Sequence, residues 1–185
     1  MTPLEIICVN TGTKYSNWYV NNLKHMIDQH SQLQYDKFHV ITEDRYEGVF
    51  NKLLMFEQFT TSQYLYFDLD VVITNDCNCF VKQDLHVCRA WWRDTWHTPL
   101  NSSIISWRGD RSDIHKMFST DPDYYMVKYH KGIDQYLYEN FNINCFETGY
   151  CSFQTIQDQQ DYNVVLFNQR YEYIKQQGWW NGYTM

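Results

Sequence analysis

The chain has 185 residues, of which 44% are hydrophobic and 20% are charged. This length predicts one domain over residues 1–185, and the composition excludes an intrinsically disordered protein. The formal net charge of −7 argues against a general nucleic-acid binder, because attraction to polyphosphate needs a basic face.

The sequence contains no segment typical of membrane insertion or secretion. Its apolar runs, such as Ile6–Val9, are far shorter than the roughly 20 residues that a membrane-spanning helix needs. The N-terminus lacks the basic stretch and apolar core of a signal peptide. The six cysteines include no two pairs at zinc-ligand spacing, so we expect six reduced thiols. These features predict a cytoplasmic protein, located in the host cytoplasm if its source is viral.

The first half of the chain alternates between predicted strands and helices. Helical spacing of apolar residues predicts one helix that Ser16 caps and that ends near His30. A second helix is predicted over Asn51–Phe59. The predicted strands, which are short and apolar, are Leu4–Val9, Phe38–Ile41 and Tyr64–Phe67. Apolar strands that alternate with helices predict a parallel sheet covered on both faces.

The second half is less regular, which predicts that its strands are partly antiparallel. Helices are predicted over Asp110–Phe118 and Asp134–Phe141, and strands over His86–Trp92, Ile104–Trp107 and Val164–Phe167. The predicted fold class is therefore α/β, with a mixed, mainly parallel, Rossmann-like sheet between helices. Ligands bind at the carboxyl edge of such sheets, where Thr11, Asp44, Asp68 and Asp70 are expected.

Two carboxylates, Asp68 and Asp70, interrupt the apolar run from Tyr64 to Ile73. At this spacing they project to one side of an extended chain. Two ionised carboxylates beside a dry core repel each other, and a hard cation such as Mg²⁺ or Mn²⁺ relieves the repulsion. Spacing alone leaves a second interpretation equally open, in which Asp68 caps a turn and Asp70 is exposed.

Three further polar segments each allow a structural and a functional interpretation. Asn101–Ser103 precedes a predicted strand, where a plain turn is favoured over an amide that holds a ligand. Asp134 and Gln135 open a predicted helix, where a simple N-cap is favoured over an acid and amide that hold a polyol. Lys52 either binds a phosphate or an acid, or is solvated. The sequence has no P-loop, dinucleotide or hydrolase-elbow motif.

Taken in order, these segments resemble the GT-A nucleotide-sugar glycosyltransferases, most closely the family 8-like glycogenin and galactosyltransferase group, in a minimal version. The resemblance covers nearly the whole chain. A D-x-D motif alone is a weak signal, whereas several landmarks in the family's order are a much stronger one. The landmarks are Cys8–Ser16, Ile41–Asp44, Lys52–Leu53, Tyr66–Asp70, Asn101–Ser103 and Asp134–Gln135.

The resemblance implies a hexosyltransferase that moves a sugar from a nucleoside-diphosphate sugar, UDP-linked, to a saccharide or protein acceptor. It implies retention of anomeric configuration. Because no carboxylate other than Asp134 is available as a nucleophile, the favoured route is a front-side displacement. Asp134 and Gln135 would be catalytic, and Mn²⁺ or Mg²⁺ would be held by Asp68, Asp70 and Asn168, which stands where the family has His. The implied donor-binding residues are Thr11, Gly12, Tyr15, Asp44, Lys52, Asp68, Asn101 and Ser102.

Two other functions stay open. A non-catalytic nucleotide-sugar or carbohydrate binder is favoured by the missing His, although the two intact polar pairs argue against it. A sugar nucleotidyltransferase would normally carry a glycine-rich basic loop after the first strand, of which Thr11–Lys14 is a poor version. Ring stacking on Trp91, Trp92 and Trp96 would suit a saccharide acceptor.

Overall fold

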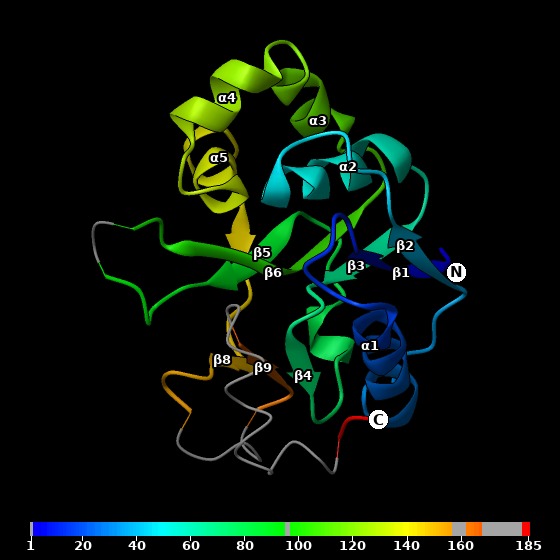
Figure 1. The fold of residues 1–185 in the computed structure, drawn as a ribbon. Helices are drawn as coiled ribbons and strands as arrows, with labels where there is room; N and C mark the ends of the chain where they lie inside the picture. Colours follow the sequence, from blue (N-terminus) through cyan, green and yellow to red (C-terminus); the bar gives the residue numbers. More distant parts are fainter. Residues whose placement is uncertain (1, 95–96, 157–161, 168–182) are drawn as a thin grey trace.

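The structure is a computed structural model that describes residues 2–94, 97–156, 162–167 and 183–185. Its centre is a six-stranded sheet in the order β2-β1-β3-β6-β5-β7 (Figure 1). The strands are β1 (Leu4–Val9), β2 (Lys37–Ile41), β3 (Gln63–Phe67), β5 (His86–Arg89), β6 (Leu100–Arg108) and β7 (Asn144–Cys145). Three of the five pairings are parallel, and β6 is antiparallel to both of its neighbours. The predicted fold class is therefore confirmed.

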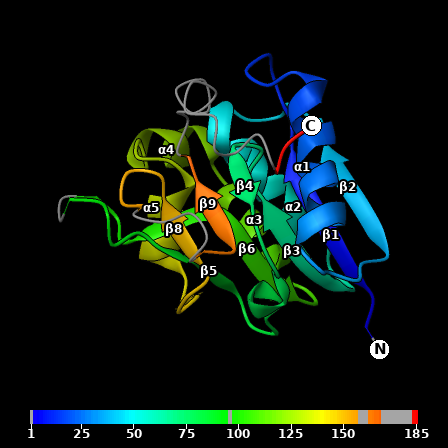
Figure 2. The same ribbon diagram turned by 90° about the horizontal axis from the view of Figure 1, so that it is seen from below.

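One face of the sheet is covered by α1 (Asn17–His30) and by a small second sheet. In the small sheet β9 (Val164–Leu166) lies between β4 (Val71–Ile73) and β8 (Tyr150–Ser152). Figure 2 shows α1 and this small sheet on the same face. Side chains alternate along a strand, so Ile6 packs with α1 here while Ile7 packs on the opposite face.

The opposite face is covered by helices that come from both halves of the chain. A 3-10 turn, η1 (Gly48–Leu53), runs directly into α2 (Leu54–Gln58), and α3 (Ser112–Phe118) and α5 (Ile133–Asn140) pack with them over a second core. The other helices among the described residues are η2 (Asn78–Phe80) and α4 (Pro122–Lys128). No helix in the described ranges is long and apolar enough to span a membrane.

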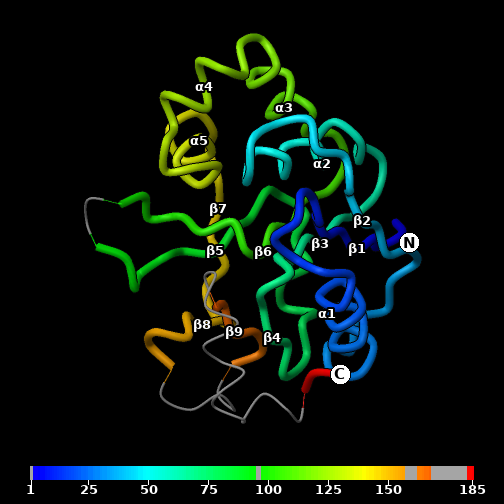
Figure 3. The backbone as a smooth tube through the Cα atoms, viewed as in Figure 1, coloured from blue at the N-terminus to red at the C-terminus, as the bar shows by residue number. Residues whose placement is uncertain are grey.

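Several predicted elements are confirmed and others need correction. The first strand has the bounds Leu4–Val9, as predicted, whereas Ser16 stands at the N-cap of α1 without a capping side-chain bond. The predicted helix over Asn51–Phe59 begins earlier, as η1, and ends at Gln58. The predicted strand from His86 ends at Arg89, not Trp92, because the chain leaves the sheet as a projecting loop (Figure 3).

The turn expected at Asn101–Ser103 is wrong, because these residues belong to β6. Asn101 pairs with Cys88 on β5, and the Ser103 carbonyl accepts a 2.9 Å hydrogen bond from the Asp68 amide. Strand β6 extends this far because neighbours on both sides satisfy its backbone groups. Five elements of the described residues were not predicted: β4, η2, α4, β7 and β8.

Candidate active site

A cavity of about 430 Å³ opens at the edge of the sheet where β1 and β3 end. Its wall includes five segments: the loop after β1, η1, the turn after β3, the start of β6 and the start of α5. The predicted site residues that line it are Thr11, Tyr15, Lys52, Asp68, Asp70, Asn101, Ser102 and Asp134. Segments far apart in the sequence therefore meet in one cavity.

The two carboxylates of the D-x-D segment each accept a hydrogen bond from a tyrosine. The Tyr66 hydroxyl donates to Oδ1 of Asp68 over 2.5 Å, and the Tyr15 hydroxyl donates to Oδ2 of Asp70 over 3.0 Å. Asp70 is only 7% exposed, so the interpretation with an exposed Asp70 is wrong. The backbone carbonyl of Asp70 also accepts a 3.2 Å bond from the Phe167 amide, which joins this turn to the end of β9.

The tyrosines beside these carboxylates remain protonated donors. Burial raises the pKa of the Tyr15 hydroxyl far above its ordinary value, and the charges of Asp70 and Asp68 raise it further. Burial likewise raises the pKa of Tyr66, with Asp68 as the next cause. Hydroxyls that cannot ionise hold the two carboxylates in place without adding negative charge.

Lys52 is not solvated but paired with the first carboxylate. Its Nζ lies 2.6 Å from Oδ1 of Asp68, and the two side chains are 13% and 19% exposed. Nζ also donates to the Ser102 hydroxyl over 3.4 Å and lies 5.4 Å from the centre of the Tyr66 ring. Lys52 therefore connects the carboxylates at the end of β3 with the start of β6.

A buried amide, Asn51, organises the end of the cavity near β1. Its Nδ2 donates to Oδ1 of Asp44 over 2.7 Å and to the Thr11 hydroxyl over 3.3 Å. Its Oδ1 accepts from the amides of Arg45 and Tyr46. Gly12 lies beside Asp44, with a positive φ of 65° that suits glycine. Neither Gly12 nor Asp44 lines the cavity itself.

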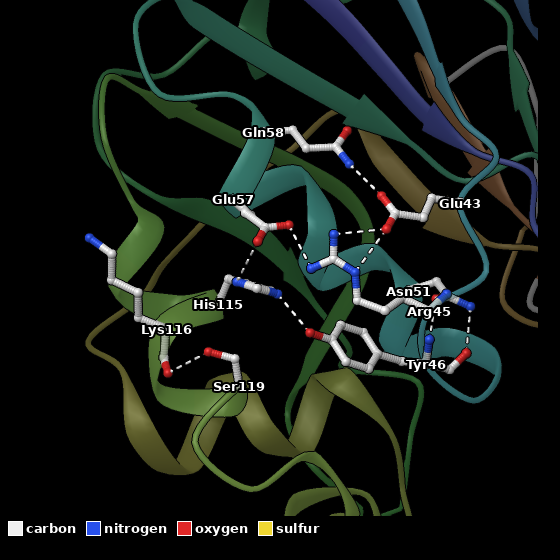
Figure 4. Close-up of polar contacts among 9 residues, drawn as sticks. All are labelled: Glu43, Arg45, Tyr46, Asn51, Glu57, Gln58, His115, Lys116 and Ser119. Carbon is white, nitrogen blue, oxygen red and sulfur yellow. Dashed lines mark hydrogen bonds and ion pairs between the residues drawn. The ribbon is translucent and has the colours of Figure 1, made fainter.

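Asn51 also joins this loop to a polar network on the helical face (Figure 4). The Arg45 guanidinium lies 2.8 Å from carboxylate oxygens of both Glu43 and Glu57. The Tyr46 hydroxyl is 2.9 Å from Nε2 of His115, whose imidazole is 5% exposed. The loop that carries Asp44 is thus fixed to α2 and α3.

Asp134 also lines the cavity, and it is not the N-cap of α5. Gly132 takes the capping position with a φ of 87°. Oδ1 of Asp134 accepts a 2.8 Å bond from the Ser102 amide, and Oδ2 lies 2.8 Å from Nη1 of Arg93. The Asn101 side chain turns back and accepts from the Ser103 amide over 3.0 Å. The N-cap interpretation is therefore wrong, and Asp134 joins α5 to β6.

Gln135, like Gly12 and Asp44, does not contribute to the cavity wall. Its Nε2 donates to Glu139 one turn along α5, and its Oε1 is buried with no hydrogen-bond partner among the residues that the structure describes. Asn168 lies outside the described residues. Within the described ranges, no group of three or more His, Cys, Asp or Glu side chains is arranged to hold a metal ion.

The sequence reasoning missed Asn51 and Arg93. A signal existed for Asn51, because an amide inside the apolar run Phe50–Phe56 needs buried partners. Nothing local marks Arg93, whose partner Asp134 is 41 residues away. With Arg93 included, the cavity wall contains four cationic side chains and three carboxylates. They are Lys14, Lys52, Arg93 and Lys131, and Asp68, Asp70 and Asp134. Such a mixture suits a ligand that has both phosphates and hydroxyls.

Solved structures share this fold at low sequence identity. A glycosyltransferase involved in the glycosylation of the major capsid of PBCV-1 has a TM-score of 0.69 and 13% identity, over 94% of this chain and 99% of that one. An active-site mutant of LgtC has a TM-score of 0.63 and 11% identity, over 89% and 87% of the two chains. GlyE of Streptococcus pneumoniae TIGR4 has a TM-score of 0.55 and 14% identity, over 80% of this chain but 46% of its own.

These similarities define the class of fold, which is that of GT-A-like glycosyltransferases. No protein-family model and no curated protein matches the sequence. Membership of the family 8-like group thus stays a prediction.

Proposed function

We propose that this chain is a glycosyltransferase that transfers a sugar from a nucleoside-diphosphate sugar, UDP-linked, to an acceptor hydroxyl. The observation that carries the proposal is the meeting of Asp68, Lys52, Ser102 and Asp134 in one cavity at the carboxyl edge of the sheet. The fold supports it, since one LgtC structure with this fold is a complex with donor and acceptor sugar analogs.

A divalent cation fits the carboxylate end of the cavity. Asp68 and Asp70 offer hard oxygen atoms, and Mg²⁺ and Mn²⁺ are commonly held by one or two carboxylates together with substrate phosphates. Asn168 is proposed as a third protein ligand through its amide oxygen. When bound, the cation would supply positive charge beside the leaving diphosphate.

The chain's own residues divide the remaining work along the cavity. The proposed nucleoside end is lined by Thr11 and Tyr15. It is supported by the loop that Asn51 holds in place. Lys52 and Lys14 would bind phosphate oxygens, because both cationic side chains line the cavity. Asp134, which lines the same cavity, would accept hydrogen bonds from hydroxyls of the transferred sugar.

The proposed reaction is a retaining transfer. The bond between the anomeric carbon and the diphosphate oxygen breaks, and its electron pair stays with that oxygen. The acceptor oxygen then bonds to the same face of the anomeric carbon and gives its proton to the leaving diphosphate. The site contributes by holding donor and acceptor in contact, which removes the entropic cost of their meeting.

An exposed aromatic ring on the loop after β5 supports a saccharide acceptor. Trp91 is 51% exposed, and its ring packs 4.9 Å from that of Tyr150. It precedes Arg93 and His97, which line the cavity wall. Exposed rings of this kind provide stacking surfaces for sugars. Trp96 lies outside the described residues.

A thermal-shift panel tests the proposal. UDP-, GDP-, ADP- and CMP-sugars are each added with Mn²⁺, with Mg²⁺ and with chelator, because a ligand that binds the folded state raises its melting temperature. We expect a rise with one nucleotide sugar that chelator abolishes, together with slow hydrolysis of that donor. Binding without hydrolysis would identify a non-catalytic binder, and no shift with any donor would refute the proposal.

A further inference from the structure

Both carboxylate oxygens of Asp134 are held by fixed donors. The Ser102 amide donates to Oδ1 and Nη1 of Arg93 lies on Oδ2, each over 2.8 Å. The Asp134 side chain is 11% exposed and that of Arg93 is 19% exposed. A carboxylate bonded on both oxygens and largely shielded from water has one defined position.

Arg93 is itself immobilised, so it can fix its partner. The same Nη1 donates to the Leu100 carbonyl over 2.5 Å, and the Arg93 amide donates to the Ala90 carbonyl over 3.1 Å. Leu100 and Ser102 both lie at the start of β6. Arg93 therefore ties the loop after β5 to the strand that positions Asp134 from its other side.

We propose that Arg93 is a positioning residue, which holds Asp134 as a fixed hydrogen-bond acceptor for a hydroxyl of the donor sugar and prevents it from acting as the nucleophile. The inference rests on the proposed glycosyltransferase function. The remaining lone pairs of Asp134 can still accept from a sugar hydroxyl. An attack on the anomeric carbon would draw negative charge away from a carboxylate oxygen that a backbone or charge-assisted bond stabilises, and such bonds are strong in a shielded site.

The charged surroundings of this pair favour arginine over lysine. Lys131 and His97 share the same part of the cavity wall. Burial lowers the pKa of His97, and the Arg93 charge lowers it further, so this imidazole adds no competing cation at neutral pH. Nη1 of the planar guanidinium can donate one N–H to a carbonyl and the other to a carboxylate in a fixed plane, whereas an ammonium on a flexible stem has no such fixed plane.

Four variants test the role: Arg93→Met, Arg93→Lys, Arg93→Gly and Asp134→Asn, with Arg111→Met as the control because Arg111 forms an exposed pair with Asp113. We expect Arg93→Met to lower kcat by about a hundredfold, since small misplacements of a positioned group have effects of this size, with little change in KM for the donor. Arg93→Lys should recover part of the loss. Added guanidinium, but not sodium at equal ionic strength, should restore Arg93→Gly.

The double variant Arg93→Met/Asp134→Asn separates positioning from an independent role. If Arg93 acts through Asp134, the double variant will be no slower than Asp134→Asn alone. Multiplied losses, a loss confined to KM, no rescue by guanidinium, or a glycosyl group trapped on Asp134 would each overturn the inference.

A nitrogen-15 NMR measurement on the protein without donor keeps this inference distinct from the proposed function. A guanidinium held as in the structure should show slow rotation of the Arg93 Nη groups, and Asp134→Asn should accelerate it. If the wild type transfers no sugar and hydrolyses no donor, the proposed function fails while this spectrum still decides whether Arg93 holds Asp134. Free rotation in the wild type would overturn the inference, even if transfer is observed.

Discussion

Replacement of Asn51 by leucine should destabilise the protein and weaken donor binding together. The substitution keeps the approximate size of the side chain but removes its polar atoms. Three backbone groups then lose a short bond: the amides of Arg45 and Tyr46, at 2.9 and 2.8 Å, and the Tyr46 carbonyl, at 2.7 Å. The Gly48 carbonyl loses only a long bond of 3.4 Å. The groups that lose a short bond are only partly buried, so each should cost about 1 kcal/mol, the lower end of the range for an unsatisfied group. The expected loss is therefore about 3 kcal/mol.

Urea unfolding of the wild type and of Asn51→Leu measures this loss as a change in the free energy of unfolding at equal m-value. Asn142→Leu is the matched control, because Asn142 is exposed and away from the loop. Donor affinity should fall as well, since Asn51 also holds Asp44 and Thr11. A loss below about 0.5 kcal/mol, which is typical of a neutral surface change, would show that water replaces the amide and that the loop does not depend on it.

Three further predictions concern other parts of the structure. Burial lowers the pKa of His115, so the imidazole binds a proton more readily in the unfolded chain, and the free energy of unfolding should fall as pH drops below about 6.5. His115→Gln should flatten this pH dependence in urea unfolding measured between about pH 5 and pH 8. An unchanged pH dependence would show that other groups cause it. Gly132→Ala should lower the free energy of unfolding by about 1–3 kcal/mol, because the added Cβ would lie 3.0 Å from Val49 Cγ2 at a φ of 87°. Gly48→Ala, whose Cβ would have nothing within 4 Å, should lower it less in the same assay. Lys52→Met leaves Asp68 without its cation, so added Mn²⁺ should raise the melting temperature of this variant more than that of the wild type; equal shifts would contradict metal binding at Asp68.

The sequence allowed the first half of the fold to be predicted because its signals are local. Strands β1 and β3 are mostly apolar, with Glu5 and Gln63 as their polar residues, and α1 repeats its buried residues at helical spacing. Helix α4 was missed because it has no buried residues to create such a pattern. Its start nevertheless carried a signal, since Asp121 caps the helix and Pro122 occupies the first turn.

The candidate site was predictable where residue chemistry is unusual for its surroundings and unpredictable where it depends on distant partners. Asp68 and Asp70 stand out because carboxylates rarely interrupt apolar runs, and the structure places both in the cavity. The role of Arg93 depends on the loop after β5 meeting α5, which no local pattern encodes. Gln135 adjoins Asp134 in sequence, but on a helix neighbouring side chains point in different directions, and Gln135 turns toward Glu139.

The antiparallel direction of β6 is what assembles the two ends of the cavity. A strand parallel to β3 would begin at the opposite edge of the sheet, far from the carboxylates that follow Phe67. Because β6 runs the other way, its first residues lie beside the end of β3, and the Asp68 amide bonds directly to Ser103. The neighbouring Ser102 can then reach both Lys52 with its hydroxyl and Asp134 with its amide. The polar start of β6, which looks like a turn in the sequence, is therefore the element that connects the proposed metal end of the site to its proposed sugar end.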